Sequence, residues 1–209
     1  MENKIIRQRK EGEPTILSNG KPEILYSGQI GAMIRLPVLL DKGKGYIEKD
    51  FQRFTRTPGT RIIAIQDNKI LLTKEFRHEL KKFDYRIPGG KVFDSFEDYL
   101  PYVLEKKVIP EEIILEAGKK ELQEEASINA QDFEIFKKSH SGASIEWDLY
   151  YIVASDISTF NEKTENEGEQ IEEIVWKDFN KVKEMCLNGE ILEDRTVANL
   201  LQFINKKDL

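Results

Sequence analysis

The hydrophobic and polar positions of this chain predict strands in the first half and a mixture of strands and helices in the second. Candidate strands rich in apolar residues lie at 23–27 and 34–40, and apolar residues alternate with polar residues from 46 to 57. Their β-branched and aromatic members favour extended structure. We therefore expect a small N-terminal β extension over residues 1–56.

Two apolar runs, 61–65 and 69–76, follow this extension. Asp67-Asn68 lies between them and is a signal for a tight β-hairpin. Further strands are expected at 133–137, 147–154 and 171–176, and further helices at 179–188 and 195–205.

The stretch from Glu111 to Ala126 has the composition of an amphipathic helix, and Pro110 suits its first position. Glu121, Glu124 and Glu125 are spaced at i, i+3 and i+4, which places them on one side of that helix. Like charges at this spacing repel, so an acidic pair beside an apolar stripe indicates a neutralising cation. Divalent cations such as Mg²⁺ prefer carboxylate oxygens. A solvated acidic helix would show the same spacing, so the preceding residues matter.

Those residues form two further motifs. Residues 86–91 read Arg-Ile-Pro-Gly-Gly-Lys, a strand end that runs into a turn, and residues 75–77 read Glu-Phe-Arg. Together with Lys-Glu-Leu-Gln-Glu-Glu-Ala-Ser-Ile at 120–128, they resemble the motifs of the Nudix hydrolases. Within that superfamily they resemble the ADP-ribose pyrophosphatase branch, over residues 51–203.

Three features depart from the Nudix motif. Lys120 stands where the motif has arginine, and Ser127 stands where it has a late glycine. The motif is also interrupted by an insertion at about 92–109, in which apolar residues at helical spacing predict a short amphipathic helix. Three roles fit its position: a lid over the substrate, a dimer contact, or decoration.

The resemblance implies an α/β fold, namely a Nudix α/β/α sandwich with a mixed β-sheet over residues 57–209, and a homodimer contact through the N-terminal extension. It also implies Mg²⁺-dependent (or Mn²⁺-dependent) hydrolysis of a nucleoside diphosphate linked to another moiety. ADP-ribose, which would give AMP and ribose 5-phosphate, is the first candidate substrate. The alternatives are another nucleoside diphosphate sugar or dinucleotide, a nucleotide-binding regulator with weak catalysis, and a protein-interaction module.

The resemblance also assigns the metal site and the general base. The expected metal ligands are the carboxylates of Glu121, Glu124 and Glu125 and the backbone carbonyl of Gly89. Because the three carboxylates share one helix, a proton acceptor must come from elsewhere in the chain. Glu146 is the first choice for this base, and Glu167 and Glu169 are the alternates.

Arginines are the expected substrate contacts, because a guanidinium can donate paired hydrogen bonds to phosphate oxygens. The resemblance of residues 46–57 to the N-terminal sheet of the ADP-ribose branch gives Arg53 and Arg56 as candidates, and Arg77, at a strand end, is the third. His140 lies in a loop that corresponds to a substrate loop of the ADP-ribose branch, but Ser141-Gly142 lacks the proline that marks this loop. That difference bears on the choice of substrate more than on the class of reaction.

Composition excludes several other functions. The chain of 209 residues is 39% hydrophobic, enough for a substantial core. A net charge of −6 argues against a protein that binds nucleic acid by neutralising phosphates. We expect a cytoplasmic protein without membrane contact, since Cys186 is the single cysteine and neither a spanning apolar run nor a signal peptide is evident.

Overall fold

The protein forms two compact units in a computed structural model, which describes residues 4–105, 107–142, 144–159 and 171–207. Unit 1 consists of Met1–Thr57, Phe93–Val108 and Ser141–Trp147. Unit 2 consists of Pro58–Val92, Ile109–His140 and Asp148–Leu209. No helix in the described residues is long and apolar enough to cross a membrane.

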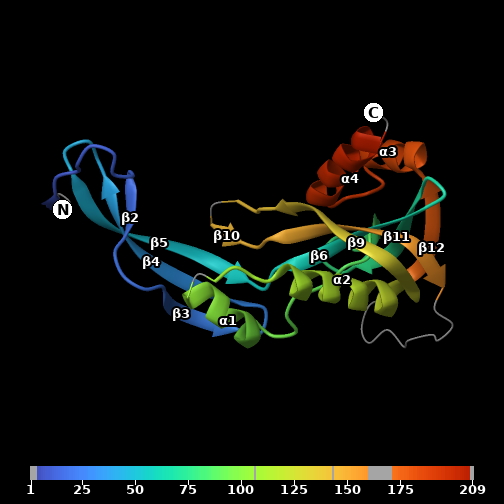
Figure 1. The fold of residues 1–209 in the computed structure, drawn as a ribbon, viewed down its shortest axis with the longest axis horizontal. Coiled ribbons are helices and arrows are strands. Elements are labelled where there is room, and N and C mark those ends of the chain that lie inside the picture. Colours follow the sequence, from blue (N-terminus) through green and yellow to red (C-terminus); the bar gives the residue numbers. More distant parts are fainter. Residues whose placement is uncertain (1–3, 106, 143, 160–170, 208–209) are drawn as a thin grey trace. The chain divides into compact units, whose positions relative to one another are not determined.

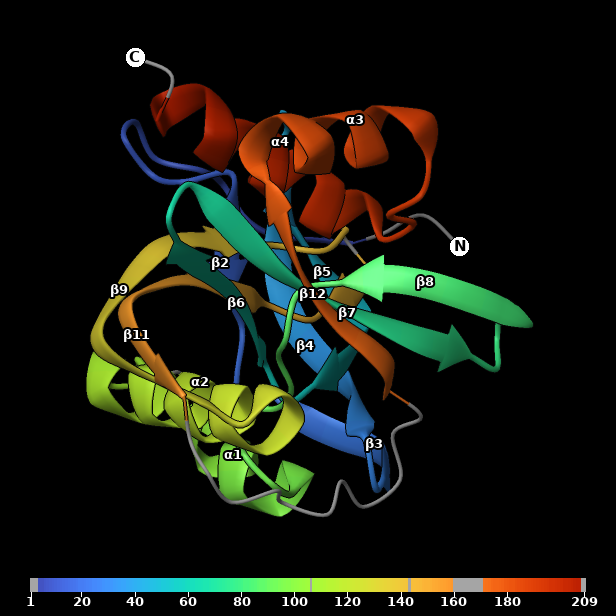
Figure 2. The same ribbon diagram turned by 90° about the vertical axis from the view of Figure 1, so that its right-hand side faces the viewer.

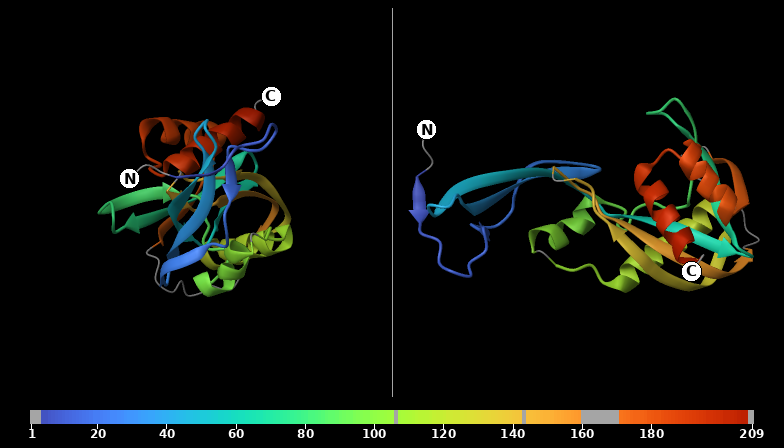
Figure 3. Two further views of the ribbon diagram at one scale, coloured as in Figure 1. Left: turned by 90° about the vertical axis from the view of Figure 1, so that its left-hand side faces the viewer. Right: turned by 90° about the horizontal axis from the view of Figure 1, so that it is seen from above.

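Unit 1 is built on a six-stranded sheet. Its strands are β1 (Ile5–Arg7), β2 (Ile16–Ser18), β3 (Glu23–Gly28), β4 (Gly31–Asp41), β5 (Tyr46–Arg56) and β10 (Ile145–Glu146). The order is β1-β5-β4-β2, with β3 paired to β4 and β10 paired to β5. The long antiparallel pair of β4 and β5 forms one twisted ribbon (Figure 3).

The inserted helix belongs to unit 1. Helix α1 (Phe96–Leu104) is capped by Ser95, whose hydroxyl accepts a hydrogen bond from the Asp98 N–H. Phe96 is buried and packs with Ala32 and Ile34 of β4. The sequence placed this insertion inside the 57–209 domain, whereas its apolar residues cover the N-terminal sheet.

Unit 2 contains a mixed six-stranded sheet. Its strands are β6 (Gly59–Gln66), β7 (Lys69–Arg77), β8 (Lys82–Arg86), β9 (Ile128–Ser139), β11 (Leu149–Thr159) and β12 (Ile171–Asp178). The order is β12-β7-β6-β11-β9, with β8 on β7. Only β6 and β11 run parallel among these described pairs. The predicted hairpin is confirmed: Asp67 and Asn68 both have positive φ, as a two-residue hairpin turn requires.

Helices cover both faces of the unit 2 sheet (Figures 1 and 2). They are α2 (Glu111–Ala126) on one face, and α3 (Phe179–Asn188) and α4 (Asp194–Lys207) on the other. Leu122 and Ala126 of α2 pack with Ile62 in the core. Gly118 permits this close packing, because a Cβ there would lie 2.6 Å from the Ile152 side chain. The predicted α/β fold with a mixed sheet is confirmed.

Candidate functional site

The turn at Gly89 and Gly90 lies against strand β6. The N–H of Ile62 donates to the Pro88 carbonyl at 2.7 Å, and the N–H of Thr60 donates to the Gly90 carbonyl at 2.9 Å. Gly89 has φ +154°, and a Cβ there would lie 2.2 Å from the Thr60 backbone oxygen. Only glycine fits this close approach.

Helix α2 brings two of the predicted carboxylates to this turn. Glu125 is buried, and its Oε2 accepts the N–H of Gly89 at 2.9 Å. One helical turn earlier, Glu121 Oε1 accepts the N–H of Lys91 at 3.2 Å. A Cβ on Gly90 would lie 2.1 Å from Glu121 Oε1, so the turn and the carboxylate are in close contact. The i, i+4 spacing therefore aims Glu121 and Glu125 at one stretch of backbone, while Glu124 is exposed.

The oxygen atoms at the turn suit a hard divalent cation. Mg²⁺ keeps several waters in proteins and is usually held by one or two carboxylates together with substrate phosphates. Glu121 and Glu125 supply such a pair. Within the described ranges, no group of three or more His, Cys, Asp or Glu side chains is arranged to hold a metal ion. The donor set thus fits a magnesium site of two carboxylates.

The sequence did not predict a buried ion pair that lies beside the turn. Arg61 Nε lies 3.2 Å from Glu193 Oε2, and the side chains are only 10% and 13% exposed. Burial favours a lower pKa for Arg61, but the charge and hydrogen bond of Glu193 outweigh it and raise the pKa. Burial likewise favours a higher pKa for Glu193, which the Arg61 charge and a hydrogen bond from Thr196 bring below its usual range. The signal in the sequence was a charged residue at the start of an otherwise apolar strand.

Three other predicted site residues lie in unit 1. Arg53 Nη1 lies 3.6 Å from Glu146 Oε1, and the Thr55 hydroxyl donates to Glu146 Oε2 at 3.0 Å. The Arg56 guanidinium lies over the Trp147 ring at 4.2 Å. Neighbouring residues of a strand point to opposite faces of the sheet. Arg53 and Glu146 therefore share one face. Arg56 and Trp147 share the other face.

The remaining candidates have other surroundings. Arg77 forms ion pairs with Glu75 at 3.5 Å and Glu79 at 2.9 Å. His140 is mostly exposed, and its Nδ1 lies 2.6 Å from Asp148 Oδ1. Two alternates for the general base, Glu167 and Glu169, lie outside the described residues.

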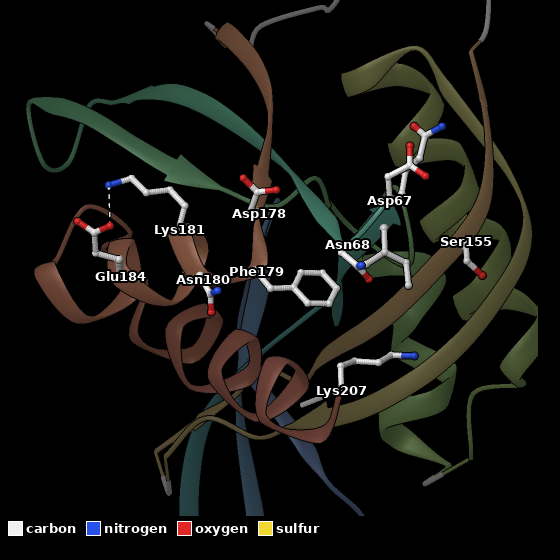
Figure 4. A pocket seen from close by; sticks show the side chains of 11 residues that line it. Asp67, Asn68, Ser155, Asp178, Phe179, Asn180, Lys181, Glu184 and Lys207 are labelled. Carbon is white, nitrogen blue, oxygen red and sulfur yellow. Dashed lines mark ion pairs between the residues drawn. The ribbon is translucent and has the colours of Figure 1, made fainter. Parts of the chain in front are cut away.

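A cavity of about 1020 Å³ opens elsewhere in unit 2 (Figure 4). It is lined by the Asp67–Asn68 hairpin, the start of α3 and Lys207 of α4. Lys181 and Glu184 form an ion pair at 3.2 Å on its wall. None of the predicted site residues lines it, so this cavity and the Gly89 turn are separate features.

Comparisons with known proteins identify the fold. No protein-family model matches the sequence, and no curated protein matches it either. Among solved structures, the chain is similar to a crystal structure of an ADP compounds hydrolase, with a TM-score of 0.64 and 19% sequence identity. The match covers 96% of each chain. At this low identity the similarity shows a shared fold.

Proposed function

We propose that the protein is a Mg²⁺-dependent (or Mn²⁺-dependent) Nudix hydrolase that cleaves a nucleoside diphosphate linked to another moiety, with ADP-ribose as the first candidate. The observation that carries this proposal is the contact between the Gly89–Gly90 turn and the paired carboxylates of Glu121 and Glu125. The similarity to an ADP compounds hydrolase supports it, since the two folds correspond over nearly the whole chain.

The chemistry requires neutralisation of the diphosphate, because the negative charge on its oxygens makes the phosphorus resist attack by water. Bound Mg²⁺ would supply this neutralisation and align the attacking and leaving oxygens. Glu121 and Glu125 would hold the cation, with Glu124 and the Gly89 carbonyl as further oxygen donors. Gly89 and Gly90, which lack side chains, let the turn approach β6 and the Glu121 carboxylate closely.

Arginine side chains would orient the substrate. A guanidinium can donate two parallel hydrogen bonds to one phosphate. Arg53 and Arg56 point to opposite faces of their sheet, so each would contact a different part of the substrate or a different active site of a homodimer. Arg77, at the end of β7, is the third candidate.

The second copy in this homodimer would be bound through unit 1. Unit 1 carries exposed apolar side chains, including Ile6 (54% exposed) and Tyr26 (67%) in its strands and Ile30 (58%) in the turn between β3 and β4. Such residues are typical of a protein interface when they gather on one surface. The mass of the protein in solution tests this contact.

Glu146 is the proposed general base. Glu146→Gln is expected to lower turnover by about 100-fold, roughly 3 kcal/mol in the barrier, and to remove the acidic limb of the pH–rate profile, because glutamine cannot accept the proton. Profiles of Glu146→Gln, Glu167→Gln and Glu169→Gln should be compared, with Mn²⁺ affinity measured for each. If Glu146→Gln retains both the turnover rate and the acidic limb of the profile, the general base is Glu167 or Glu169.

Lys120 is proposed to orient a carboxylate of the metal site without touching the substrate. Arginine would restore a planar, forked donor, so Lys120→Arg should be tolerated or mildly activating. Lys120→Ala should lower kcat about tenfold, which corresponds to ~1.4 kcal/mol. The neighbouring exposed Lys119, which pairs with Glu116, provides the control Lys119→Ala. Full activity of Lys120→Ala would contradict this role.

The decisive test of the function is a screen of diphosphate nucleotides. ADP-ribose, other nucleoside diphosphate sugars and dinucleotides should be incubated with Mg²⁺ or Mn²⁺, and the released phosphomonoester measured. Binding without turnover would favour the nucleotide-binding regulator, which the departures at Lys120 and Ser127 motivate. If neither nucleotide nor divalent cation raised the melting temperature, the protein-interaction module would be favoured.

A further inference from the structure

The carbonyl of Gly89 is held differently from its neighbours in the turn. The carbonyls of Pro88 and Gly90 accept hydrogen bonds from backbone N–H groups of β6, at 2.7 and 2.9 Å. The Gly89 carbonyl instead accepts a hydrogen bond from Arg61 Nη1 at 3.2 Å. The same Nη1 donates to the Thr60 carbonyl at 3.0 Å, which fixes the guanidinium beside the strand.

Both peptide groups that flank Gly89 are therefore fixed from outside the turn. On one side the Gly89 N–H donates to Glu125 at 2.9 Å, and on the other the carbonyl accepts from Arg61. Glycine has weak conformational preferences of its own. The peptides are therefore oriented by these two contacts together with the bond from the Ile62 N–H to the Pro88 carbonyl and a long bond of 3.5 Å from the Gly90 N–H to the Thr60 hydroxyl. The Gly89 carbonyl is partly buried, and a carbonyl shielded from water is destabilised when it loses its donor. Loss of Arg61 would therefore favour rotation of the Gly89–Gly90 peptide.

The guanidinium is itself held by a buried network. Arg61 Nε pairs with Glu193 at 3.2 Å, and the Thr196 hydroxyl donates to the same Glu193 oxygen at 2.7 Å. The Tyr151 hydroxyl lies 3.3 Å from the Thr196 hydroxyl. This network connects the Gly89 turn to the residues at the start of α4. The Arg61 guanidinium is therefore held by the turn on one side and by Glu193 on the other.

We propose that Arg61 is a positioning residue: its guanidinium, held by Glu193, sets the orientation of the Gly89 carbonyl and thereby the geometry of divalent-cation binding at the turn. The consequence for metal binding rests on the proposed function, whereas the orientation of the turn does not. Lysine cannot replace arginine here, because Nε binds the carboxylate while Nη1 reaches two carbonyls, and an ammonium offers one nitrogen.

Arg61→Lys separates this role from that of the buried ion pair. Lysine keeps the positive charge beside Glu193, so the melting temperature should fall by only a few degrees. In the metal-free protein, amide hydrogen exchange at Gly89–Lys91 should become about tenfold faster, because the Gly89 carbonyl has lost its donor. The Kd for Mn²⁺, measured by titration calorimetry, should rise about tenfold, and kcat should fall more than KM changes.

Val182→Ala serves as the control for a general loss of stability. Val182 is fully buried in α3, and its truncation lowers stability by leaving a cavity. Exchange at Gly89–Lys91 and Mn²⁺ affinity should stay as in the wild type. If Val182→Ala accelerated turn exchange as much as Arg61→Lys does, the effect would be one of stability, and the proposal would be overturned.

Two further outcomes decide the inference. Wild-type exchange at the turn in a folded Arg61→Lys protein would overturn it, and so would faster exchange with unchanged Mn²⁺ affinity and turnover. If the wild type itself neither binds Mn²⁺ nor cleaves a diphosphate, the proposed function fails. In that case the exchange measurement alone still decides whether Arg61 orients the turn.

Discussion

Glu125→Gln is expected to lower turnover of a diphosphate substrate by about 100-fold or more, which is close to 3 kcal/mol in the barrier. The substitution removes the negative charge that would hold a divalent cation. It keeps an amide oxygen in the position where Glu125 accepts the Gly89 N–H at 2.9 Å, so the protein should stay folded. Initial rates at saturating substrate and Mg²⁺, together with the melting temperature, provide the measurement.

A matched control lies on the same helix. Glu116 is exposed and pairs with Lys119, so Glu116→Gln changes the net charge of α2 equally without affecting the turn. Its rate should be within about twofold of the wild type, because an exposed ion pair contributes little. If Glu125→Gln hydrolysed substrate at a near-normal rate, the assignment of the metal site to this carboxylate would be refuted.

The helix and its carboxylates could be predicted because their signals are local. Helix formers fill Glu111–Ala126, and the structure places α2 at these residues. The apolar spacing of Leu115, Gly118, Leu122 and Ala126 predicts the buried side; the last three are buried, and Leu115 is half-buried. The alignment of Glu121 and Glu125 follows from helix geometry alone. The expectation that the Gly89 turn lies opposite them came from the family resemblance.

The packing of the insertion could not be predicted, because it depends on a partner distant in the sequence. The apolar spacing of residues 92–109 predicted a helix, and α1 forms there. That spacing does not say which surface covers the apolar side. Phe96 packs against Ile34, 62 positions earlier in the chain. Nothing in the local pattern indicates that contact, so the role of the insertion stayed open.

The arginines of β5 show a different limit of prediction from the sequence. Alternation along β5 was already visible in the sequence, and it implies that Arg53 and Arg56 point to opposite faces. Both were nevertheless assigned to substrate, because the assignment came from the family resemblance. The pairing of Glu146 with Arg53 depends on β10, a strand of two residues that joins β5 from far along the chain. So short a strand gives no periodic signal.

Gly90→Ala is expected to fold almost normally and to lose about 100-fold in turnover. The φ of Gly90 lies outside the left-handed region, so alanine can adopt its backbone conformation. Its Cβ would lie 2.1 Å from Glu121 Oε1, and the flexible end of that side chain must move away. The hydrogen bond from the Lys91 N–H to Glu121 is then lost, at a cost of about 0.5–1.5 kcal/mol, while the carboxylate leaves its place beside the turn.

Substitutions at two other glycines provide comparisons for this result. At Gly89 a Cβ would lie 2.2 Å from the Thr60 backbone oxygen, which cannot move freely, and φ is +154°; Gly89→Ala should therefore lose stability as well as activity. At Gly28 a Cβ would approach only the exposed Tyr26 side chain, at 3.3 Å, so Gly28→Ala should retain both. Thermal unfolding, Mn²⁺ titration and initial rates distinguish the three variants. A Gly90→Ala protein with wild-type Mn²⁺ affinity and turnover would show that Glu121 holds no catalytic metal at this turn.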